Sequence, residues 1–296
     1  MFDLIIIGMG PAGIAASIYA KRSNLKVLCL EKGMIGGELN YIDKIDNYPG
    51  LNDISGSALA YKLLEHIDEM KIDYRFETVK DILKKDNYYE IETNKEKYTT
   101  KYIILATGRK ARKLGLENED TFLGRGISYC AICDGAFFKN KVVSVVGGGM
   151  AALEEALYLA NIVKKVYLIH RRDKFNATPS IIEKIINNPK IEILYNEEVV
   201  KLNGKDHLES IELKSGKEIF TSGLFIYIGY TPNIDYLKNL DILGSKGYAI
   251  VDKNFKTKED GIYAVGDLVE KNNYQILLAM ADGITATLDV TNNLLK

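Results

Sequence analysis

Short apolar runs along the chain are separated by turns rich in glycine and by stretches that mix small, apolar and charged residues. The runs 4–7 (LIII) and 26–31 (KVLCLE) predict strands, because each is apolar and bounded by turn residues. Between them, 14–23 (IAASIYAKRS) has the small and apolar residues of a helix that packs against a sheet. A strand, a helix and a second strand in this order predict a βαβ unit at the start of the chain.

The turn after the first strand has the pattern G-x-G-x-x-G, with Gly8, Gly10 and Gly13. Glycines allow a tight turn and a close approach of the backbone to a pyrophosphate, and the helix N-terminus supplies unpaired N–H groups. The motif alone is equally compatible with an ordinary turn. Glu31 ends the next strand at about the spacing of an acid that binds an adenosine ribose, so the combination predicts a dinucleotide site.

A second unit of the same kind spans residues 141–172 and again has the order strand, glycine turn, helix, strand. Its turn contains Gly147 and Gly149, with Ala152 in the third place. Two dinucleotide sites in one chain are typical of a flavoprotein that exchanges electrons with a second nucleotide.

The end of the second unit is basic, with His170, Arg171 and Arg172 where an acid would bind a ribose 2′-hydroxyl. Basic groups at this place favour a 2′-phosphate, as in NADPH. The alternative is a strand end whose charges are simply solvated.

Two further strands, 101–108 (KYIILATG) and 262–267 (IYAVGD), end in turns of small residues, and such ends meet the cofactor at the carboxyl edge of a parallel sheet. If both belong to the first nucleotide domain, the second unit is inserted within it, and 223–233 contains its last strand and the start of the return linker. The sequence therefore predicts an α/β fold with two Rossmann-like, three-layer nucleotide-binding domains, the second inserted into the first. We expect a discontinuous FAD-binding domain at 1–114 and 244–296, and an inserted NAD(P)-binding domain at 115–243.

Composition and charge indicate which kinds of partner and which location to expect. The chain has 296 residues, enough for two domains, with 47% hydrophobic and 27% charged residues and a formal net charge of −1. This balance gives no electrostatic reason to bind nucleic acid or an anionic membrane. The first residues enter an apolar strand without a signal-like segment before it, and no apolar run approaches the length of a membrane span. We therefore expect a cytoplasmic protein.

Cys130 and Cys133 are separated by two residues and followed directly by Asp134. Three cysteines in a cytosolic chain do not make a disulfide framework, and Cys29 lies in an apolar strand where it packs as a small side chain. A structural zinc site needs about four ligands, and none of the three histidines has a partner spacing, so we expect no metal. The pair predicts thiol–disulfide chemistry, with Asp134 as general acid and base.

With these motifs in order, the sequence resembles the low-molecular-weight thioredoxin reductases along nearly its whole length. The resemblance is carried by GMGPAG (8–13), GGELNYIDKIDNYPG (36–50), ATG (106–108), GRGISYCAICDGAFF (124–138), GGGMAALEEALYL (147–159), HRRDKF (170–175), FIYIGYTPN (225–233) and GIYAVGD (261–267). It implies FAD in the outer domain, a nicotinamide nucleotide in the inserted domain, and a homodimer. It also implies that Cys133 faces the flavin and that Cys130 attacks the protein substrate.

By the same resemblance, the FAD residues are Gly8, Gly10, Pro11, Ala12, Gly13, Glu31, Lys32, Gly36, Gly37, Glu38, Asn47, Ala106, Thr107, Gly108, Gly266, Asp267, Tyr274, Gln275 and Ile276. The expected NADPH residues are Gly147, Gly148, Gly149, Met150, Ala151, Ala152, His170, Arg171, Arg172 and Asn176.

Three positions depart from the family's usual pattern, and all three concern the electron donor. Met150 replaces an Asp or Asn, and Asn176 and Tyr274 each replace an arginine. Some relatives use ferredoxin in place of a nicotinamide nucleotide. The expected function is reduction of thioredoxin or a similar small disulfide protein by NADPH, with ferredoxin as an alternative donor and a redox-sensing flavoprotein as a less favoured alternative.

Overall fold

The computed structural model describes residues 1–42, 45 and 47–295. They form two compact units: unit 1 comprises Met1–Lys110 and Thr231–Lys296, and unit 2 comprises Ala111–Tyr230. The sequence placed the boundaries after residues 114 and 243. Residues 231–243 belong to unit 1 because Tyr236, Leu237 and Leu240 are buried in its core.

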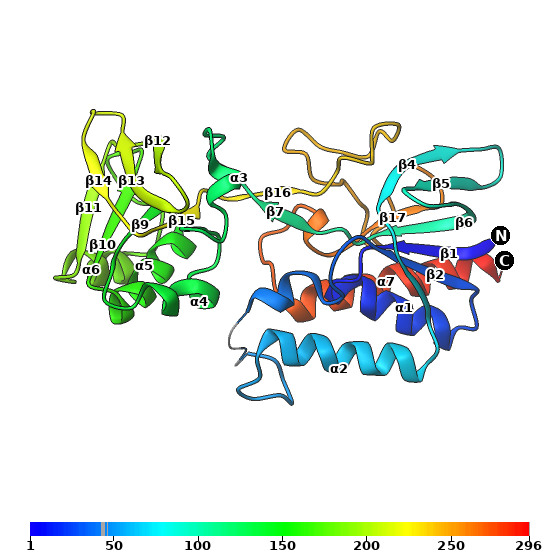
Figure 1. Ribbon diagram of the computed structural model, residues 1–296. Helices are drawn as coiled ribbons and strands as arrows, with labels where there is room; N and C mark the ends of the chain where they lie inside the picture. The colour runs from blue at the N-terminus through cyan, green and yellow to red at the C-terminus, as the bar shows by residue number, and fades with distance from the viewer. Residues whose placement is uncertain (43–44, 46, 296) are drawn as a thin grey trace. The chain divides into compact units, whose positions relative to one another are not determined.

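Unit 1 is built on a largely parallel sheet (Figure 1). Its parallel strands are β1 (Phe2–Ile7), β2 (Val27–Glu31), β3 (Asp73–Phe76), β6 (Lys97–Leu105) and β17 (Ile262–Ala264). They run in the order β3-β2-β1-β6, and β17 also pairs with β6. The strands β4 (Val79–Lys84) and β5 (Tyr89–Thr93) extend the sheet beyond β6 in antiparallel pairings.

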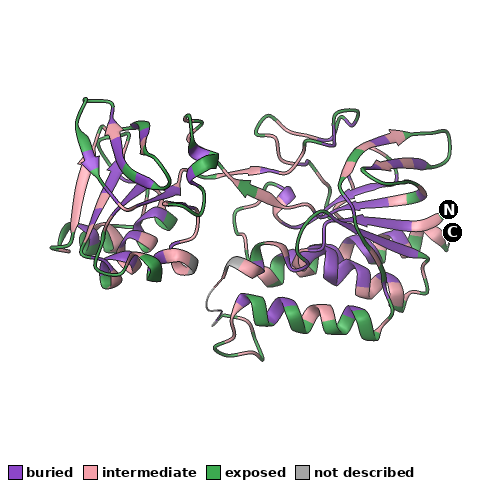
Figure 2. Cartoon of the chain, viewed as in Figure 1, coloured by how far each residue is buried: buried purple, intermediate pink, exposed green. Residues whose placement is uncertain are grey.

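Three helices lie on one face of this sheet: α1 (Pro11–Arg22), α2 (Gly56–Glu69) and α7 (Ile276–Leu294). Successive residues of β1 pack into different cores, Leu4 and Ile6 on the helix side, Ile5 and Ile7 with the antiparallel strands and residues 236–251. Both faces of the sheet are therefore covered, which explains why the strand is a continuous apolar run (Figure 2).

Unit 2 repeats this plan with other residues. Its parallel strands are β8 (Ile127–Ser128), β9 (Val142–Gly147), β10 (Lys165–His170), β11 (Ile191–Tyr195) and β15 (Gly223–Tyr227), in the order β11-β10-β9-β15-β8. One face packs on α5 (Met150–Ile162) and α6 (Pro179–Ile186). The other packs on an antiparallel layer of β12 (Val199–Gly204), β13 (Leu208–Leu213) and β14 (Glu218–Phe220). The predicted α/β class with two Rossmann-like domains is confirmed.

Shorter elements complete the chain. They are η1 (Gly37–Tyr41), α3 (Glu119–Phe122), α4 (Ala131–Asp134), η2 (Gly135–Phe138) and η3 (Gly266–Leu268). At the unit boundary, β7 (Arg109–Ala111) pairs with β16 (Tyr230–Pro232).

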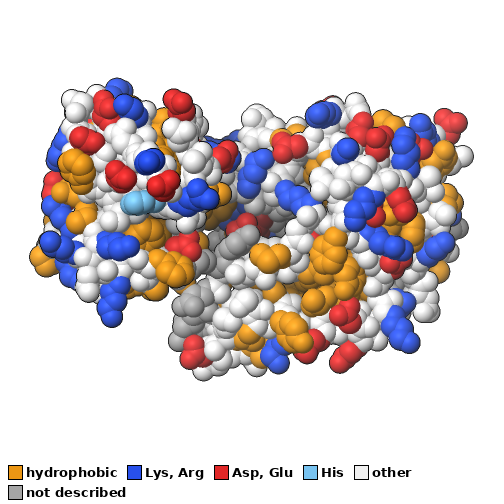
Figure 3. Space-filling view, in the orientation of Figure 1, with side chains coloured by type: hydrophobic (Ala, Val, Ile, Leu, Met, Phe, Trp, Pro, Cys, Tyr) orange, Lys and Arg blue, Asp and Glu red, His pale blue; other side chains and the backbone are white. Residues whose placement is uncertain are grey.

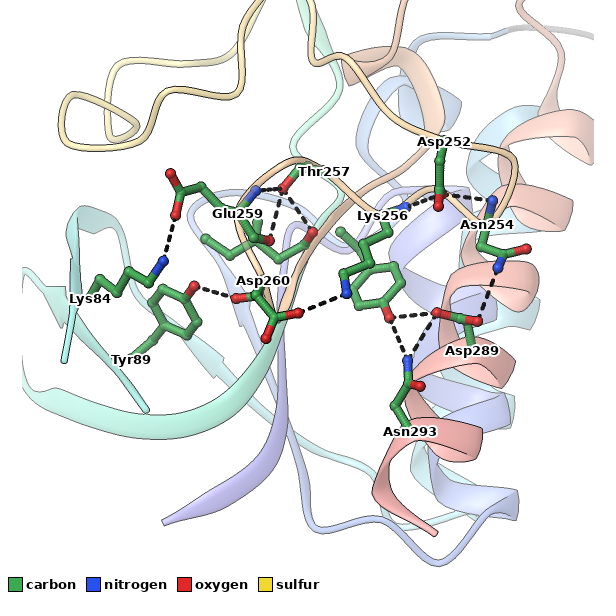
Figure 4. A network of polar contacts seen from close by, with 12 residues as sticks. Lys84, Tyr89, Asp252, Asn254, Lys256, Thr257, Glu259, Asp260, Asp289 and Asn293 are labelled. Carbon is green, nitrogen blue, oxygen red and sulfur yellow. Dashed lines mark hydrogen bonds and ion pairs between the residues drawn. The ribbon is translucent and has the colours of Figure 1, made fainter. Parts of the chain in front are cut away.

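A polar network fixes the turn that precedes β17 (Figure 4). Lys84 on β4 pairs with Glu259 at 2.8 Å, and the Tyr263 hydroxyl donates to Asp289 of α7 at 2.6 Å. Lys256 and Asp260 pair at 2.7 Å within the turn. The network lies at the amino end of β17, so it holds the strand whose carboxyl end carries the Gly266–Asp267 turn.

Acidic and basic side chains are interspersed on the face of the molecule shown in Figure 3. No helix within the described part of the chain combines the length and the apolar character that a membrane crossing requires.

Candidate cofactor and disulfide sites

The glycine turn of unit 1 needs its glycines. Gly8 has a φ of +97°, and a Cβ there would lie 2.5 Å from the Ala106 carbonyl oxygen. A Cβ at Gly13 would lie 1.9 Å from the Gly8 oxygen. Helix α1 begins after Gly10, which offers no side-chain cap. The first N–H groups of the helix are thus open to an anion such as a pyrophosphate.

Glu31, the last residue of β2, is buried beside this turn. Its Oε2 accepts a hydrogen bond from the Met9 N–H at 2.7 Å, and Oε1 accepts one from the Gly33 N–H at 2.8 Å. The carboxylate therefore holds the glycine turn as well as standing where a ribose is expected, since each oxygen can accept a further bond. Lys32, the next residue along the chain and also an expected FAD residue, is exposed.

Replacing Glu31 with alanine is expected to weaken FAD retention and to lower the free energy of unfolding by about 1–3 kcal/mol, because two backbone N–H groups lose a charged acceptor. Flavin content after gel filtration and thermal unfolding measure the two effects. Glu65→Ala, at an exposed glutamate of α2 outside the expected FAD residues, is the control. Unchanged flavin content in the Glu31 variant would remove Glu31 from the cofactor site.

A second glycine loop packs on the first. The Gly36 N–H donates to the Met9 carbonyl at 2.7 Å, and a Cβ at Gly37 would lie 3.3 Å from the Gly10 Cα. Gly36 has a φ of +100°, which few other residues adopt. The close approach of two backbones leaves N–H groups and little side-chain bulk, which fits the phosphates of a dinucleotide.

The carboxyl end of β17 reaches the same place. A Cβ at Gly266 would lie 2.9 Å from the Ala12 Cβ, and the Gly266 N–H donates to Asp282 at 3.0 Å. Asp267 pairs with Arg109, whose Nε lies 3.1 Å from its Oδ2. The turns after β1, β6 and β17 therefore converge at one edge of the sheet, as expected for a nucleotide site.

The remaining predicted FAD residues lie around this edge. Asn47 donates to the Gln275 side chain at 3.1 Å, directly before Ile276 begins α7. Thr107 bonds to the Asn233 carbonyl and the Tyr236 hydroxyl, each at 2.9 Å. These contacts occupy the Thr107 side chain.

Gly108 and Tyr274 both lie next to Arg109, Gly108 along the chain and Tyr274 in space. Gly108, with a φ of +60°, precedes Arg109 in the chain, and the Tyr274 ring lies beneath the Arg109 guanidinium, 4.0 Å from centroid to carbon. Sequence reasoning missed Arg109. Its position directly after the ATG turn was the available signal.

The glycine turn of unit 2 is formed in the same way. Gly147 has a φ of +153°, and a Cβ there would lie 2.4 Å from the Tyr227 oxygen. Helix α5 begins at Met150 after Gly149, again without a side-chain cap. Met150 and Ala151 are exposed at the helix start, and Ala152 is buried.

His170 packs beneath this turn. A Cβ at Gly148 would lie 2.1 Å from the His170 Cε1, and the Nε2 lies 3.0 Å from the Lys174 carbonyl oxygen. Burial lowers the pKa of His170, so its ring is neutral at physiological pH. The positive charge at this strand end therefore rests on Arg171 and Arg172, which are exposed.

Asn176 lies next to the glycine turn of unit 2. Its N–H donates to the Gly148 carbonyl at 2.7 Å, and the residue forms a parallel bridge with Gly149. The exposed Asn176 side chain thus starts from the turn where a phosphate is expected.

The cysteine segment follows β8. Cys130 is disulfide-bonded, and the side chain of Cys133 lies outside the described part of the structure. The Ser128 hydroxyl donates to Asp134 at 2.6 Å and accepts from the Cys130 N–H at 3.0 Å. Ser128 thereby links the acid to the backbone of Cys130. Cys29 is different, because burial raises its pKa to about 12 and keeps it an unreactive thiol.

Tyr227 contacts the start of α4, the helix that follows Cys130. Its hydroxyl accepts from the Ala131 N–H at 2.6 Å and is hydrogen-bonded to Glu155 of α5. Burial raises the pKa of Glu155 to about 7, and its Oε2 has no partner among the described residues. Sequence reasoning missed both residues, since they are far from the cysteines along the chain.

Comparison with known proteins identifies the family. The sequence matches the pyridine nucleotide-disulphide oxidoreductases over residues 2–283. A thioredoxin reductase of Ureaplasma parvum is 40% identical over 294 residues, 97% of this chain and 95% of that protein. A thioredoxin reductase of Bacillus subtilis is 38% identical over 296 residues, 98% of this chain and 94% of that protein.

Solved structures agree. The crystal structure of a Lactococcus lactis thioredoxin reductase has a TM-score of 0.88 at 37% identity, covering 100% of this chain and 99% of that one. A ferredoxin-flavin thioredoxin reductase of Clostridium acetobutylicum has a TM-score of 0.56 at 33% identity, covering 99% and 98%. The family uses FAD and NADPH, which the two glycine turns fit. The chain therefore belongs to the pyridine nucleotide-disulphide oxidoreductases and, among them, to the thioredoxin reductase family.

Proposed function

We propose that the protein is a thioredoxin-disulfide reductase that carries electrons from NADPH to FAD, then to a Cys130–Cys133 disulfide, and finally to thioredoxin or a similar small redox protein. The observation that carries the proposal is a disulfide-bonded Cys130, followed by a helix that ends in Asp134, in a chain with two nucleotide-type glycine turns. The thioredoxin reductase relatives match along nearly their whole length, which supports the same assignment.

Unit 1 supplies the cofactor site. FAD, when bound, takes up two electrons from the donor and makes them available to a disulfide. The residues of the chain would bind and orient it: the Gly8–Gly13 turn and the Gly36–Gly37 loop would hold the phosphates, and Glu31 would accept hydrogen bonds from the ribose.

The cysteine pair carries out the exchange with the protein substrate. The Cys130 thiolate attacks one sulfur of the substrate disulfide, forming a mixed disulfide and releasing a substrate thiolate. Cys133 then attacks the Cys130 sulfur, which closes the disulfide of the enzyme and releases the second substrate thiolate. Asp134 moves the protons that accompany these steps.

The charges around the second glycine turn indicate which electron donor the protein uses. Arg171 and Arg172 are exposed at the end of β10, where a 2′-phosphate is expected, so we propose NADPH over NADH. Met150 and Asn176 offer no charge at the turn. Ferredoxin is the second candidate, because a relative with a solved structure is named a ferredoxin-flavin thioredoxin reductase.

Anaerobic rapid mixing tests the donor. We expect NADPH to bleach the flavin in under about one second, within the range of enzyme turnover, with NADH slower. Asn176→Arg is expected to tighten NADPH by roughly 10- to 100-fold through one added charge-assisted contact, with little effect on NADH. Asn176→Gln is the neutral control. Prompt bleaching by reduced ferredoxin, with none by NADPH over minutes, would assign ferredoxin instead.

Two further properties complete the proposal. The family resemblance implies a homodimer, which sedimentation analysis measures directly. A cytosolic location fits a substrate that is kept reduced in that compartment.

A further inference from the structure

Arg109 occupies a central position at the carboxyl edge of the unit 1 sheet. It is the first residue of β7 and directly follows the Ala106–Gly108 turn at the end of β6. Its Nε lies 3.1 Å from Asp267 Oδ2, and its side chain is 20% exposed. The guanidinium thus joins the turn after β6 to the turn after β17.

The carboxylates of Glu38 and Asp267 both interact electrostatically with the Arg109 guanidinium. Burial raises the pKa of Glu38, Arg109 lowers it and Asp267 raises it, so all three charged groups act on one another. Glu38 lies in the first turn of η1, directly after Gly37, whose Cα region packs against Gly10. Two carboxylates beside a site for a pyrophosphate would oppose binding of that anion unless a cation compensates them.

Tyr274 shows why the cation is an arginine. The Arg109 guanidinium carbon lies over the Tyr274 ring, 4.0 Å from its centroid, while the Nε pairs with Asp267. A guanidinium can stack and donate from its edge at the same time, whereas a lysine ammonium is a point charge without a flat face. The Tyr274 hydroxyl is held in addition by the Lys271 N–H at 3.4 Å.

We propose that Arg109 is a positioning residue of the FAD site, which compensates the charges of Glu38 and Asp267 and holds the Tyr274 ring in place. The proposal rests on the proposed binding of FAD in unit 1. Arg109 supplies a positive charge to a site where tyrosine replaces the family's usual arginine at position 274.

Dissociation of FAD from the full-length holoprotein tests this role, followed on dilution by the recovery of free flavin fluorescence. Arg109→Ala is expected to raise the Kd for FAD by roughly 10- to 100-fold, because it leaves two carboxylates uncompensated. Lys110→Ala is the matched control, since the neighbouring Lys110 pairs only at the surface with the exposed Asp235. It is expected to leave the Kd within about twofold of the wild-type value.

A double-mutant cycle separates charge compensation from a merely structural role. In a Glu38→Gln background, the loss caused by Arg109→Ala is expected to shrink by about fivefold or more, because one of the two charges is already absent. Arg109→Lys, which keeps the charge, is expected to lose roughly three- to tenfold and serves if the alanine variant does not fold.

The outcomes are distinct. Equal Kd values for Arg109→Ala and the wild type overturn the positioning role, and equal losses with and without the Glu38→Gln change overturn charge compensation. If Arg109→Ala does not fold, a wild-type Kd in Arg109→Lys overturns the stacking role. A wild-type protein that holds no FAD refutes the proposed function itself.

Discussion

Replacing Cys130 or Cys133 with serine is expected to abolish disulfide reduction while FAD stays bound and reducible. The expected FAD residues lie in unit 1 and the cysteine segment in unit 2, so the change should leave the proposed flavin site intact. A serine hydroxyl forms no disulfide, so neither the transfer from the flavin nor the exchange with thioredoxin can be completed. The loss should therefore be complete within detection.

Two measurements separate the steps. Flavin reduction by the donor is followed anaerobically by absorbance, and thioredoxin reduction is followed by the thiols produced. Cys29→Ala is the control, because Cys29 is a buried free thiol in β2 and takes no part in the exchange. Ordinary turnover of Cys133→Ser with thioredoxin would show that the electrons do not pass through the pair.

The parts of the fold that the sequence predicted are those with local signals. A glycine turn between an apolar strand and a helix is specified within about 30 residues, so both βαβ units could be located, with Glu31 at the end of β2. The compact units divide after Tyr230, whereas the expected boundary lies after residue 243. The return segment carries Tyr236 and Leu240 into the core of unit 1, and nothing in its local pattern distinguishes the two cores.

The contacts that sequence reasoning missed join residues distant along the chain. Arg109 contacts Tyr274, and the Ala131 N–H contacts Tyr227, although the partners are far apart along the chain. His170 is a further example. Its place in a basic run predicts a phosphate ligand, but no local pattern indicates that its ring packs against Gly148 or that burial lowers its pKa. The role of a polar side chain depended here on its neighbours in space.

Asp134→Asn is expected to slow thioredoxin reduction by roughly 10²- to 10⁴-fold, the usual contribution of a general acid and base. The asparagine keeps an oxygen that can accept the 2.6 Å hydrogen bond from Ser128, so the backbone of the cysteine segment should stay in place. What the variant loses is a group that can release and regain a proton. Flavin reduction by the donor should remain at the wild-type rate, since that step precedes the exchange.

Ser128→Ala provides the contrast that assigns the effect of Asp134 to proton transfer. It removes the hydroxyl that links the acid to the Cys130 N–H but leaves the carboxylate, so we expect a loss of only about tenfold, as for one hydrogen bond to a charged group. The pH profile decides between the two roles. If Asp134 moves the proton, the rate of Asp134→Asn should recover partly at higher pH, where hydroxide can take over the removal of the proton, whereas Ser128→Ala keeps the wild-type profile. A wild-type rate in Asp134→Asn would reduce the acid to a structural role at the end of α4.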